Sequence, residues 1–128
     1  MKNEIKFEGG NVCVCKNGIV SFTTSVDKLE LEHAQGFIDC LVSLGQTTDV
    51  LVLFDAKSLK ESTAAAVKKY TAEKLEKNAT ALAVLNNSAV SRFLIHTFLA
   101  IYRPNIPVRM FEDEAQAKEW LLEFKAPQ

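Results

Sequence analysis

The chain has 128 residues, which suits one domain that buries roughly two-thirds of the surface of its unfolded form. It contains 48% hydrophobic and 24% charged residues, and 15 basic against 16 acidic side chains leave a net charge of -1. This composition is typical of a globular protein. It excludes a strongly basic nucleic-acid-binding domain, and no apolar run reaches the ~18 residues that span a bilayer.

The first ten residues, MKNEIKFEGG, lack the apolar segment of a signal peptide. The three cysteines, Cys13, Cys15 and Cys40, are an odd number without the spacing of a disulfide framework. We therefore expect a single cytoplasmic domain over residues 1–128, with no membrane span and no nucleic-acid partner.

The clearest local signal is Asn17-Gly18, the preferred pair for a two-residue type I′ hairpin turn, because both positions need a positive φ. A turn there pairs Cys15 with Val20 and Cys13 with Phe22. Since side chains alternate between the two faces of a strand, these four residues are expected together on the core face.

Two interpretations of the Cys13-x-Cys15 pair are open. Free cysteines in a strand are commonly small buried hydrophobic residues, and we favour this interpretation. A metal site would need further ligands, for which Cys40, His33 and His96 are available, at no recognisable spacing. We therefore predict no metal and no cofactor.

Helical and strand patterns alternate after the hairpin. Apolar residues at helical spacing predict a helix over 31–44, and strong helix formers after a candidate N-cap at Ser62 predict a second helix over 64–77. The continuously apolar runs 50–54 and 80–85 predict strands buried on both faces.

The last third of the chain continues the alternation. A helix is predicted over 89–102, halted by Pro104, and a short strand over 106–111. A capping-box pattern, Asp113-x-x-Gln116, precedes a last helix. Its apolar stripe is Ala117, Trp120, Leu121 and Phe124.

The order of elements is thus a β-hairpin followed by repeated βα units. Such an order predicts an α/β fold with a mixed five-stranded sheet, parallel crossovers and about four helices packed on it.

The run AVLNNSAVSRF, residues 83–93, joins the second buried strand to the third helix. Loops at the carboxyl ends of parallel strands often bind ligands. This one has no glycine, no Gly-Lys-Ser/Thr and no nearby acid to hold a phosphate or a metal. We therefore interpret Asn87 or Ser88 as the N-cap of the helix.

The third helix is apolar around most of its circumference. At ~100° per residue, one side gathers four apolar residues that we assign to the sheet: Val90, Leu94, Phe98 and Ile101. A neighbouring flank carries Ile95, Leu99 and Tyr102. We predict that this flank contacts a partner, most simply a second copy of the chain, and the alternative is burial under the terminal helix.

A narrow polar stripe on the same helix consists of Arg92, His96 and Arg103. A solvated face is the interpretation we favour for these residues. Contact with an anion is the alternative.

Three stretches of the second half carry a resemblance to a known family: the helix entry SAVSRF, the strand approach RPNIPVRMF and the final helix DEAQAKEWL. Over residues 81–124 the chain resembles small bacterial STAS-like (SpoIIAA-like) proteins, and upstream the likeness rests on the order of elements. The resemblance implies an α/β sandwich, a cytosolic location and no catalytic chemistry. It also implies kinship with anti-sigma-factor antagonists and with CRAL-TRIO-type lipid-binding domains.

The resemblance also suggests a regulatory site. Antagonists of this kind act through a serine at the N-terminus of the helix after the central strand, in an Asp-Ser-Ser-Gly or similar context. A kinase partner phosphorylates that serine, and the added charge breaks the complex. The matching stretch, KESTAAAV, places Ser62 or Thr63 near the site, although Glu61 replaces the aspartate and alanine replaces the glycine. Ser62 is therefore a candidate phospho-switch or simply an N-cap.

Catalytic residues do not assemble in the sequence. Neither His33 nor His96 has a nucleophile and an orienting acid near it, and Asp55 is best interpreted as a cap of the loop after its strand. We predict a non-enzymatic protein-interaction or regulatory module that forms a homodimer, with a regulatory protein as a further partner.

The alternative function is a carrier or sensor of an apolar small molecule, by analogy of fold with CRAL-TRIO domains. A chain of this length leaves little room for a cavity that holds a whole lipid.

Overall fold

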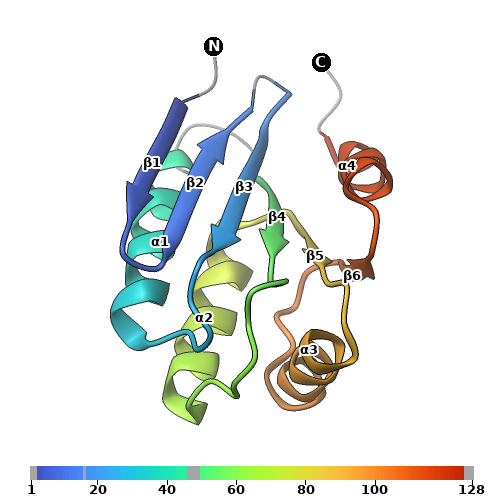
Figure 1. Ribbon diagram of the computed structural model, residues 1–128. Coiled ribbons are helices and arrows are strands. Elements are labelled where there is room, and N and C mark those ends of the chain that lie inside the picture. Colours follow the sequence, from blue (N-terminus) through green and yellow to red (C-terminus); the bar gives the residue numbers. More distant parts are fainter. Residues whose placement is uncertain (1–2, 16, 46–49, 126–128) are drawn as a thin grey trace.

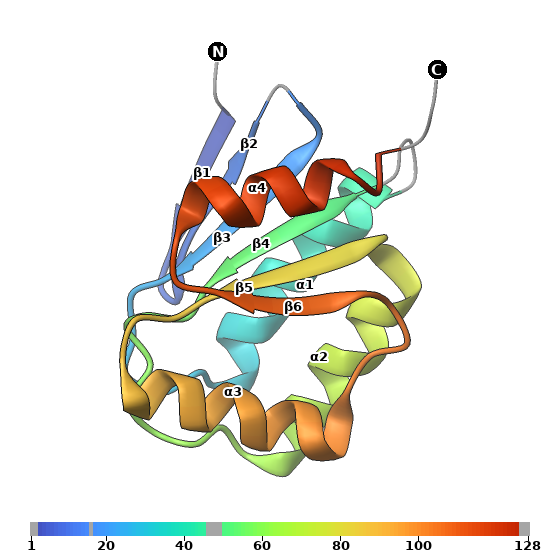
Figure 2. The same cartoon turned by 90° about the vertical axis from the view of Figure 1, so that its right-hand side faces the viewer.

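The computed structural model describes residues 3–15, 17–45 and 50–125. Within these ranges the chain forms one six-stranded sheet in the order β1-β2-β3-β4-β5-β6, together with four helices (Figures 1 and 2). The strands are β1 (Asn3–Phe7), β2 (Gly10–Val14), β3 (Ile19–Thr24), β4 (Leu51–Asp55), β5 (Ala81–Leu85) and β6 (Val108–Phe111). The helices are α1 (Leu31–Gly45), α2 (Ala65–Asn78), α3 (Ala89–Tyr102) and α4 (Glu114–Leu122).

The sheet is mixed, as predicted. Strands β1, β2 and β3 pair antiparallel, whereas β3, β4, β5 and β6 pair parallel through helical crossovers. The α/β fold and its four helices are therefore confirmed for the described part of the chain. No helix in these ranges combines the length and the apolar character that crossing a bilayer would require.

The sheet has one strand more than predicted, because β1 carries no signal of burial. Glu4 and Lys6 flank Ile5, whose side chain remains 51% exposed at the edge of the sheet. Charged residues, and lysine above all, are typical of edge strands because they discourage pairing with another chain. Because its sequence is mostly polar and charged, a search for hydrophobic runs does not identify this segment as a strand.

The predicted register of the β2–β3 hairpin is wrong by one residue. The N–H of Cys15 donates to the carbonyl of Ile19 at 2.9 Å, so the connection has three positions and not two. Gly18 ends this connection with a φ of 90°. Three-residue hairpin loops commonly place a left-handed glycine there, so Asn17-Gly18 marks the turn correctly but not its length.

A one-residue shift exchanges the two faces of a strand. Val12 lies opposite Phe22, and both are buried in the core. Cys13 lies opposite Ser21 on the other face, so the prediction that it shares the core face with Phe22 is wrong. Cys15 packs against the smaller hydrophobic cluster beneath α4.

The sheet separates two hydrophobic layers, and β4 and β5 are buried on both faces as predicted. Val52 and Leu82 belong to the larger cluster on the α1 and α2 side. Leu51 and Ala83 belong to the cluster that α4 covers (Figure 2). This alternation within two short strands requires a helical layer on each side.

Aromatic side chains anchor α1 on the sheet. The ring of Phe37 stacks on that of Phe22 with centroids 4.9 Å apart, and it meets Phe54 edge-on at 6.0 Å. Such pairs add about 0.5–1.5 kcal/mol beyond the area that they bury. Phe54 is thereby held at the middle of the sheet, where it lines a cavity between α2, α3 and the sheet.

The stripe of the last helix is also confirmed. Ala117 and Leu121 are 0% exposed, while Trp120 and Phe124 pack against the same cluster. Asp113 is the N-cap and accepts a hydrogen bond from the N–H of Ala115 at 3.3 Å.

Two glycines with positive φ allow a matched test of the fold. A Cβ on Gly10, at φ 149°, would lie 1.9 Å from the carbonyl oxygen of Thr23, whereas a Cβ on Gly18 would meet nothing within 4 Å. We expect Gly10→Ala to lower the free energy of unfolding by more than ~3 kcal/mol, because a backbone clash adds to the strain. Gly18→Ala should cost about 1 kcal/mol, from strain alone. Urea denaturation of both variants measures the difference, and equal losses would contradict the close approach of β2 and β3.

Candidate functional site

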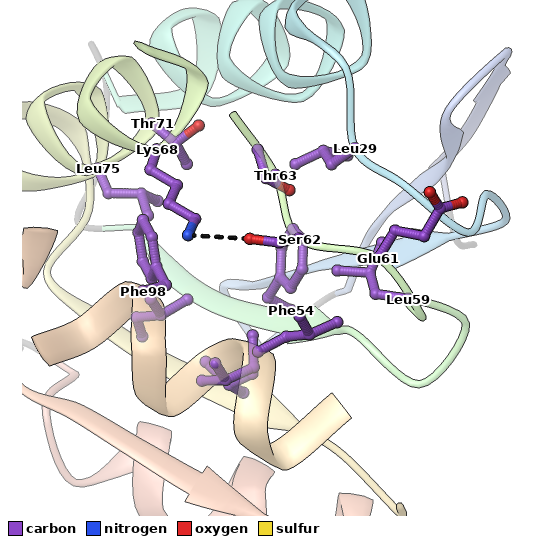
Figure 3. A pocket seen from close by; sticks show the side chains of 14 residues that line it. Leu29, Phe54, Leu59, Glu61, Ser62, Thr63, Lys68, Thr71, Leu75 and Phe98 are labelled. Carbon is purple, nitrogen blue, oxygen red and sulfur yellow. Dashed lines mark hydrogen bonds between the residues drawn. The ribbon is translucent and has the colours of Figure 1, made fainter. Parts of the chain in front are cut away.

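A small apolar cavity of about 80 Å³ lies between α2, α3 and the sheet (Figure 3). The sheet contributes Phe54, Leu82 and Val84. Helix α2 contributes Lys68, Thr71 and Leu75, and helix α3 contributes Leu94, Ile95 and Phe98. The remaining lining residues come from the loop before α1 and from the segment between β4 and α2: Leu29, Leu59, Glu61, Ser62 and Thr63.

The segment between β4 and α2 forms a fixed rim for this cavity. The hydroxyl of Thr24, at the end of β3, donates to the carbonyl of Asp55 at 3.0 Å. The N–H of Glu61 donates to the carbonyl of Asp27 at 3.0 Å. These bonds tie the segment to the loop after β3, and so they hold the position of Ser62.

The mouth of the cavity carries a positive charge beside a hydroxyl group. The Nζ of Lys68 donates to the Oγ of Ser62 at 3.3 Å, whereas the carboxylate of Glu61 is turned away from Lys68 (Figure 3). Helix α2 has Ala64 as its N-cap, and no side chain of the described residues caps it. The amides of its first turn add partial positive charge near the same place.

The prediction that Ser62 caps α2 is wrong, because the helix begins three residues later, at Ala65. Ser62 is exposed at the rim of the cavity, and Thr63 is half-buried and lines it. Both residues therefore precede the helix N-terminus, as the family resemblance implied. Their phosphorylation stays a prediction.

The structure corrects the predicted faces of α3. Ile95, assigned to an outward flank, is 8% exposed and belongs to the core, and Leu99 packs against that core. Tyr102 is half-buried beside Arg103 in a groove between α2 and α3. This flank is therefore not a free surface.

The side assigned to the sheet is instead partly open to solvent. Val90 is 50% exposed and Ile101 is 68% exposed, whereas Leu94 and Phe98 line the cavity. Burial of the helix under α4, the alternative, is also wrong, because α4 covers the opposite face of the sheet (Figures 1 and 2).

The predicted orientation of α3 is wrong because of residues at the start of the helix. Of the two predicted candidates, Asn87 and Ser88, Ser88 is the N-cap and accepts a hydrogen bond from the N–H of Ser91 at 3.1 Å. Ser91 is 0% exposed, and its hydroxyl donates to the carbonyl of Ser88 at 3.3 Å. The buried face therefore begins at a small polar residue, which hydrophobic periodicity cannot recognise.

We call the uncharged, solvent-facing side of this helix the outer face of α3. It consists of Ala89, Val90, Phe93, Thr97, Ala100 and Ile101, of which Thr97 is half-buried, and the exposed side chains of Arg92 and His96 lie along its border. Phe93, like Ile101, is 68% exposed, and none of the six side chains is charged.

The polar stripe of α3 is not gathered into one site. Arg92 forms an ion pair with Glu112, and a guanidinium nitrogen of Arg103 donates to the carbonyl of Val108 at 3.3 Å. His96 is exposed between them along the helix. These separate partners favour the solvated face over an anion site.

The remaining candidates for chemistry have structural partners. His33 is 7% exposed, and its Nδ1 accepts a hydrogen bond from the N–H of Glu30 at 3.1 Å. Asp55 accepts from the N–H of Lys57 at 3.0 Å, which confirms its role as a cap of the loop.

Cys40 is a poor nucleophile. Burial raises the pKa of the Cys40 thiol above its ordinary value, and the negative charge of Asp39 raises it further. The thiol is therefore protonated at neutral pH. Within the described ranges, no group of three or more His, Cys, Asp and Glu side chains is placed to hold a metal ion.

Comparison with known proteins supports the fold. The family model described as "Domain of unknown function (DUF7793)" matches residues 13–125. No curated protein matches the chain. A crystal structure of an uncharacterized protein of the DUF3478 family from Shewanella loihica PV-4, with a SpoIIAA-like fold, matches with a TM-score of 0.60. The match covers 94% of this chain and 92% of that one at 16% sequence identity. It shows the fold alone and confirms the SpoIIAA-like architecture predicted from the sequence.

A pair of substitutions tests the corrected orientation of α3. Ile95→Ala should lower the free energy of unfolding by about 2–4 kcal/mol, because it opens a cavity in the core. Phe93→Ala, which removes a larger but exposed side chain, should change it by less than about 0.5 kcal/mol. Thermal or urea denaturation of dilute protein gives both values. A larger loss for Phe93→Ala would mean that the helix is turned the other way.

Proposed function

This chain belongs to the DUF7793 family and has a SpoIIAA-like fold, and we propose that it is a non-enzymatic interaction module that pairs with a second copy of itself. The outer face of α3 is the observation that carries the proposal. Phe93 and Ile101 are each 68% exposed on this face, whose six residues carry no charge and which the exposed Arg92 and His96 border. Large apolar side chains that stay exposed on one face of a helix are a feature of interaction sites.

The spacing of the large side chains supports a second copy as the partner. Two α3 helices that cross antiparallel about a two-fold axis at Thr97 would set Phe93 of one copy against Ile101 of the other, since each lies four residues from Thr97. Isologous contacts need such self-complementarity. The small side chains of Ala89 and Ala100 would allow a close approach of the two helices.

We also propose that the protein is not an enzyme. His33 and Asp55 are engaged in backbone caps, and burial raises the pKa of the Cys40 thiol, which makes it a weaker nucleophile. An enzyme of this fold would need a nucleophile or general base with a free acceptor in a cleft. We place the module in the cytosol, where free thiols persist.

A regulatory role through Ser62 or Thr63 belongs to the same proposal. A phosphate on Ser62 would lie beside the Nζ of Lys68, which already donates to its hydroxyl, and near the uncapped first turn of α2. Both features stabilise a dianion. A kinase would in that case be the regulatory protein partner.

The cavity supports a second candidate function, a carrier or sensor of an apolar small molecule. Its lining is mostly apolar, and it lies between α2, α3 and the sheet. The volume of about 80 Å³ is well below the roughly 300 Å³ at which pockets for drug-sized ligands begin. A longer ligand would therefore require α3 to move.

Substitution of the outer face tests self-association. We expect the wild-type protein to be a dimer and Phe93→Asp to be a folded monomer, because a charge would be buried in the pairing. Leu122→Asp is the matched control, since Leu122 is 38% exposed on α4 at the other side of the sheet. Sedimentation velocity over a range of concentrations reports the masses. A monomeric wild type, or a Phe93→Asp protein that keeps the dimer mass, would show the proposal to be wrong.

Phosphate transfer tests the switch. Incubated with ATP and a lysate of its source cells, the wild-type protein should gain one phosphate group, and Ser62→Ala should lose this gain. Thr63→Ala is the matched control and distinguishes the two hydroxyls. Intact-protein mass spectrometry counts the phosphates. Equal phosphorylation of wild type and Ser62→Ala would remove Ser62 from the proposal.

A further inference from the structure

The charged groups at the mouth of the cavity suggest what kind of ligand would enter it. Lys68 is half-buried, and its Nζ reaches the rim, where it donates to the Oγ of Ser62. Within the described ranges, no carboxylate forms an ion pair with this ammonium group, and the carboxylate of Glu61 is turned away (Figure 3). The rim is therefore a place where an anion gains a charged hydrogen-bond donor.

Two groups next to Lys68 also favour an anion. Ser62 has a hydroxyl that can donate to an oxyanion, and the first turn of α2 begins beside it without a side-chain cap. Amides at a helix N-terminus favour negative charge. The ammonium group, the hydroxyl and the helix end thus converge on one side of the mouth.

The interior of the cavity is apolar, unlike its rim. Phe54, Leu75, Leu82 and Phe98 offer no hydrogen-bonding group to a ligand, so the part that enters must be apolar. The cavity of about 80 Å³ is smaller than an engineered cavity of about 150 Å³ that binds benzene. The resting cavity therefore has room for the end of an aliphatic chain and not for a whole lipid.

Helix α3 is the wall best able to yield to a longer chain. Of its residues, Ser91 and Ile95 are buried. Leu94 and Phe98, which face the cavity, are only half-buried. Outward movement of this helix would lengthen the cavity without disturbing β4 or β5.

We propose that the cavity binds a single-chain aliphatic acid, with its chain between α3 and the sheet and its oxyanion on Lys68 and Ser62. This inference rests on the second candidate function, the carrier or sensor, and names its ligand class. The oxyanion replaces the Lys68–Ser62 hydrogen bond with a charged contact. An uncharged or cationic head group gains nothing comparable there.

Three probes of one chain length test the ligand class: octanoate, 1-octanol and octylamine. Titration of the full chain, followed by the backbone amide NMR signals of cavity residues, gives a dissociation constant for each probe. We expect octanoate to bind at least about fivefold more tightly than either other probe, because it alone forms the charge-assisted hydrogen bond.

Variants of α2 assign the selectivity to one side chain. Lys68→Met keeps the length of the side chain but removes the charge, and it should reduce the affinity for octanoate to that for 1-octanol. Lys68→Arg should restore the preference. Lys69→Met is the matched control, because it removes the same charge from the next residue, which lines a different groove, and it should leave all three affinities unchanged. A melting curve of each variant confirms that it is folded.

The outcomes separate the two proposals. Binding of all three probes with equal affinity, or an unchanged preference in Lys68→Met, would overturn the assignment of an acid while the carrier function stands. Failure of every probe to shift the signals of cavity residues would overturn the carrier function and this inference together.

Discussion

Burial of β4 and β5 on both faces is the constraint on which the rest of the structure depends. Their side chains alternate between two hydrophobic clusters, so each face of the sheet needs its own cover. Parallel crossovers are right-handed, and with strands in sequential order they place α1, α2 and α3 on one side. Helix α4, which follows the last strand, covers the other side. Small residues at Ala81, Ala83 and Ala117 let it lie close to the sheet.

The position of α3 follows from the same constraint. Three helices share one face of a sheet whose last strand has four residues, so α3 lies at the margin of the layer beside α2. Some of its apolar side chains therefore face the cavity, and others face solvent. Leu94, Ile95 and Phe98 line the cavity, and Phe93 and Ile101 stay exposed. The cavity and the outer face therefore belong to one helix, and a ligand that moves α3 would also alter the surface that we propose for pairing.

The site combines residues that sequence reasoning identified with one that it missed. The family resemblance pointed to Ser62 and Thr63, and both line the cavity. Lys68 was missed, because a lysine in a helix rich in lysines gives no signal of its own. It lies six residues from Ser62 along the chain, and in the folded protein its Nζ is 3.3 Å from the Oγ of Ser62. A prediction of the helix start at Ala64 alone would not have identified this contact.

The sequence by itself determined the α/β class, the four helices, the buried strands and the cap at Asp113, and it narrowed the cap of α3 to Asn87 or Ser88. These features depend on local periodicity and on hydrogen bonds between near neighbours. Only the tertiary structure decided the edge strand β1, the register of the hairpin and the direction in which α3 faces. An edge strand is defined by its neighbour, and a one-residue change in loop length inverts a strand. A helix that is apolar on most sides can be oriented only by the elements against which it packs.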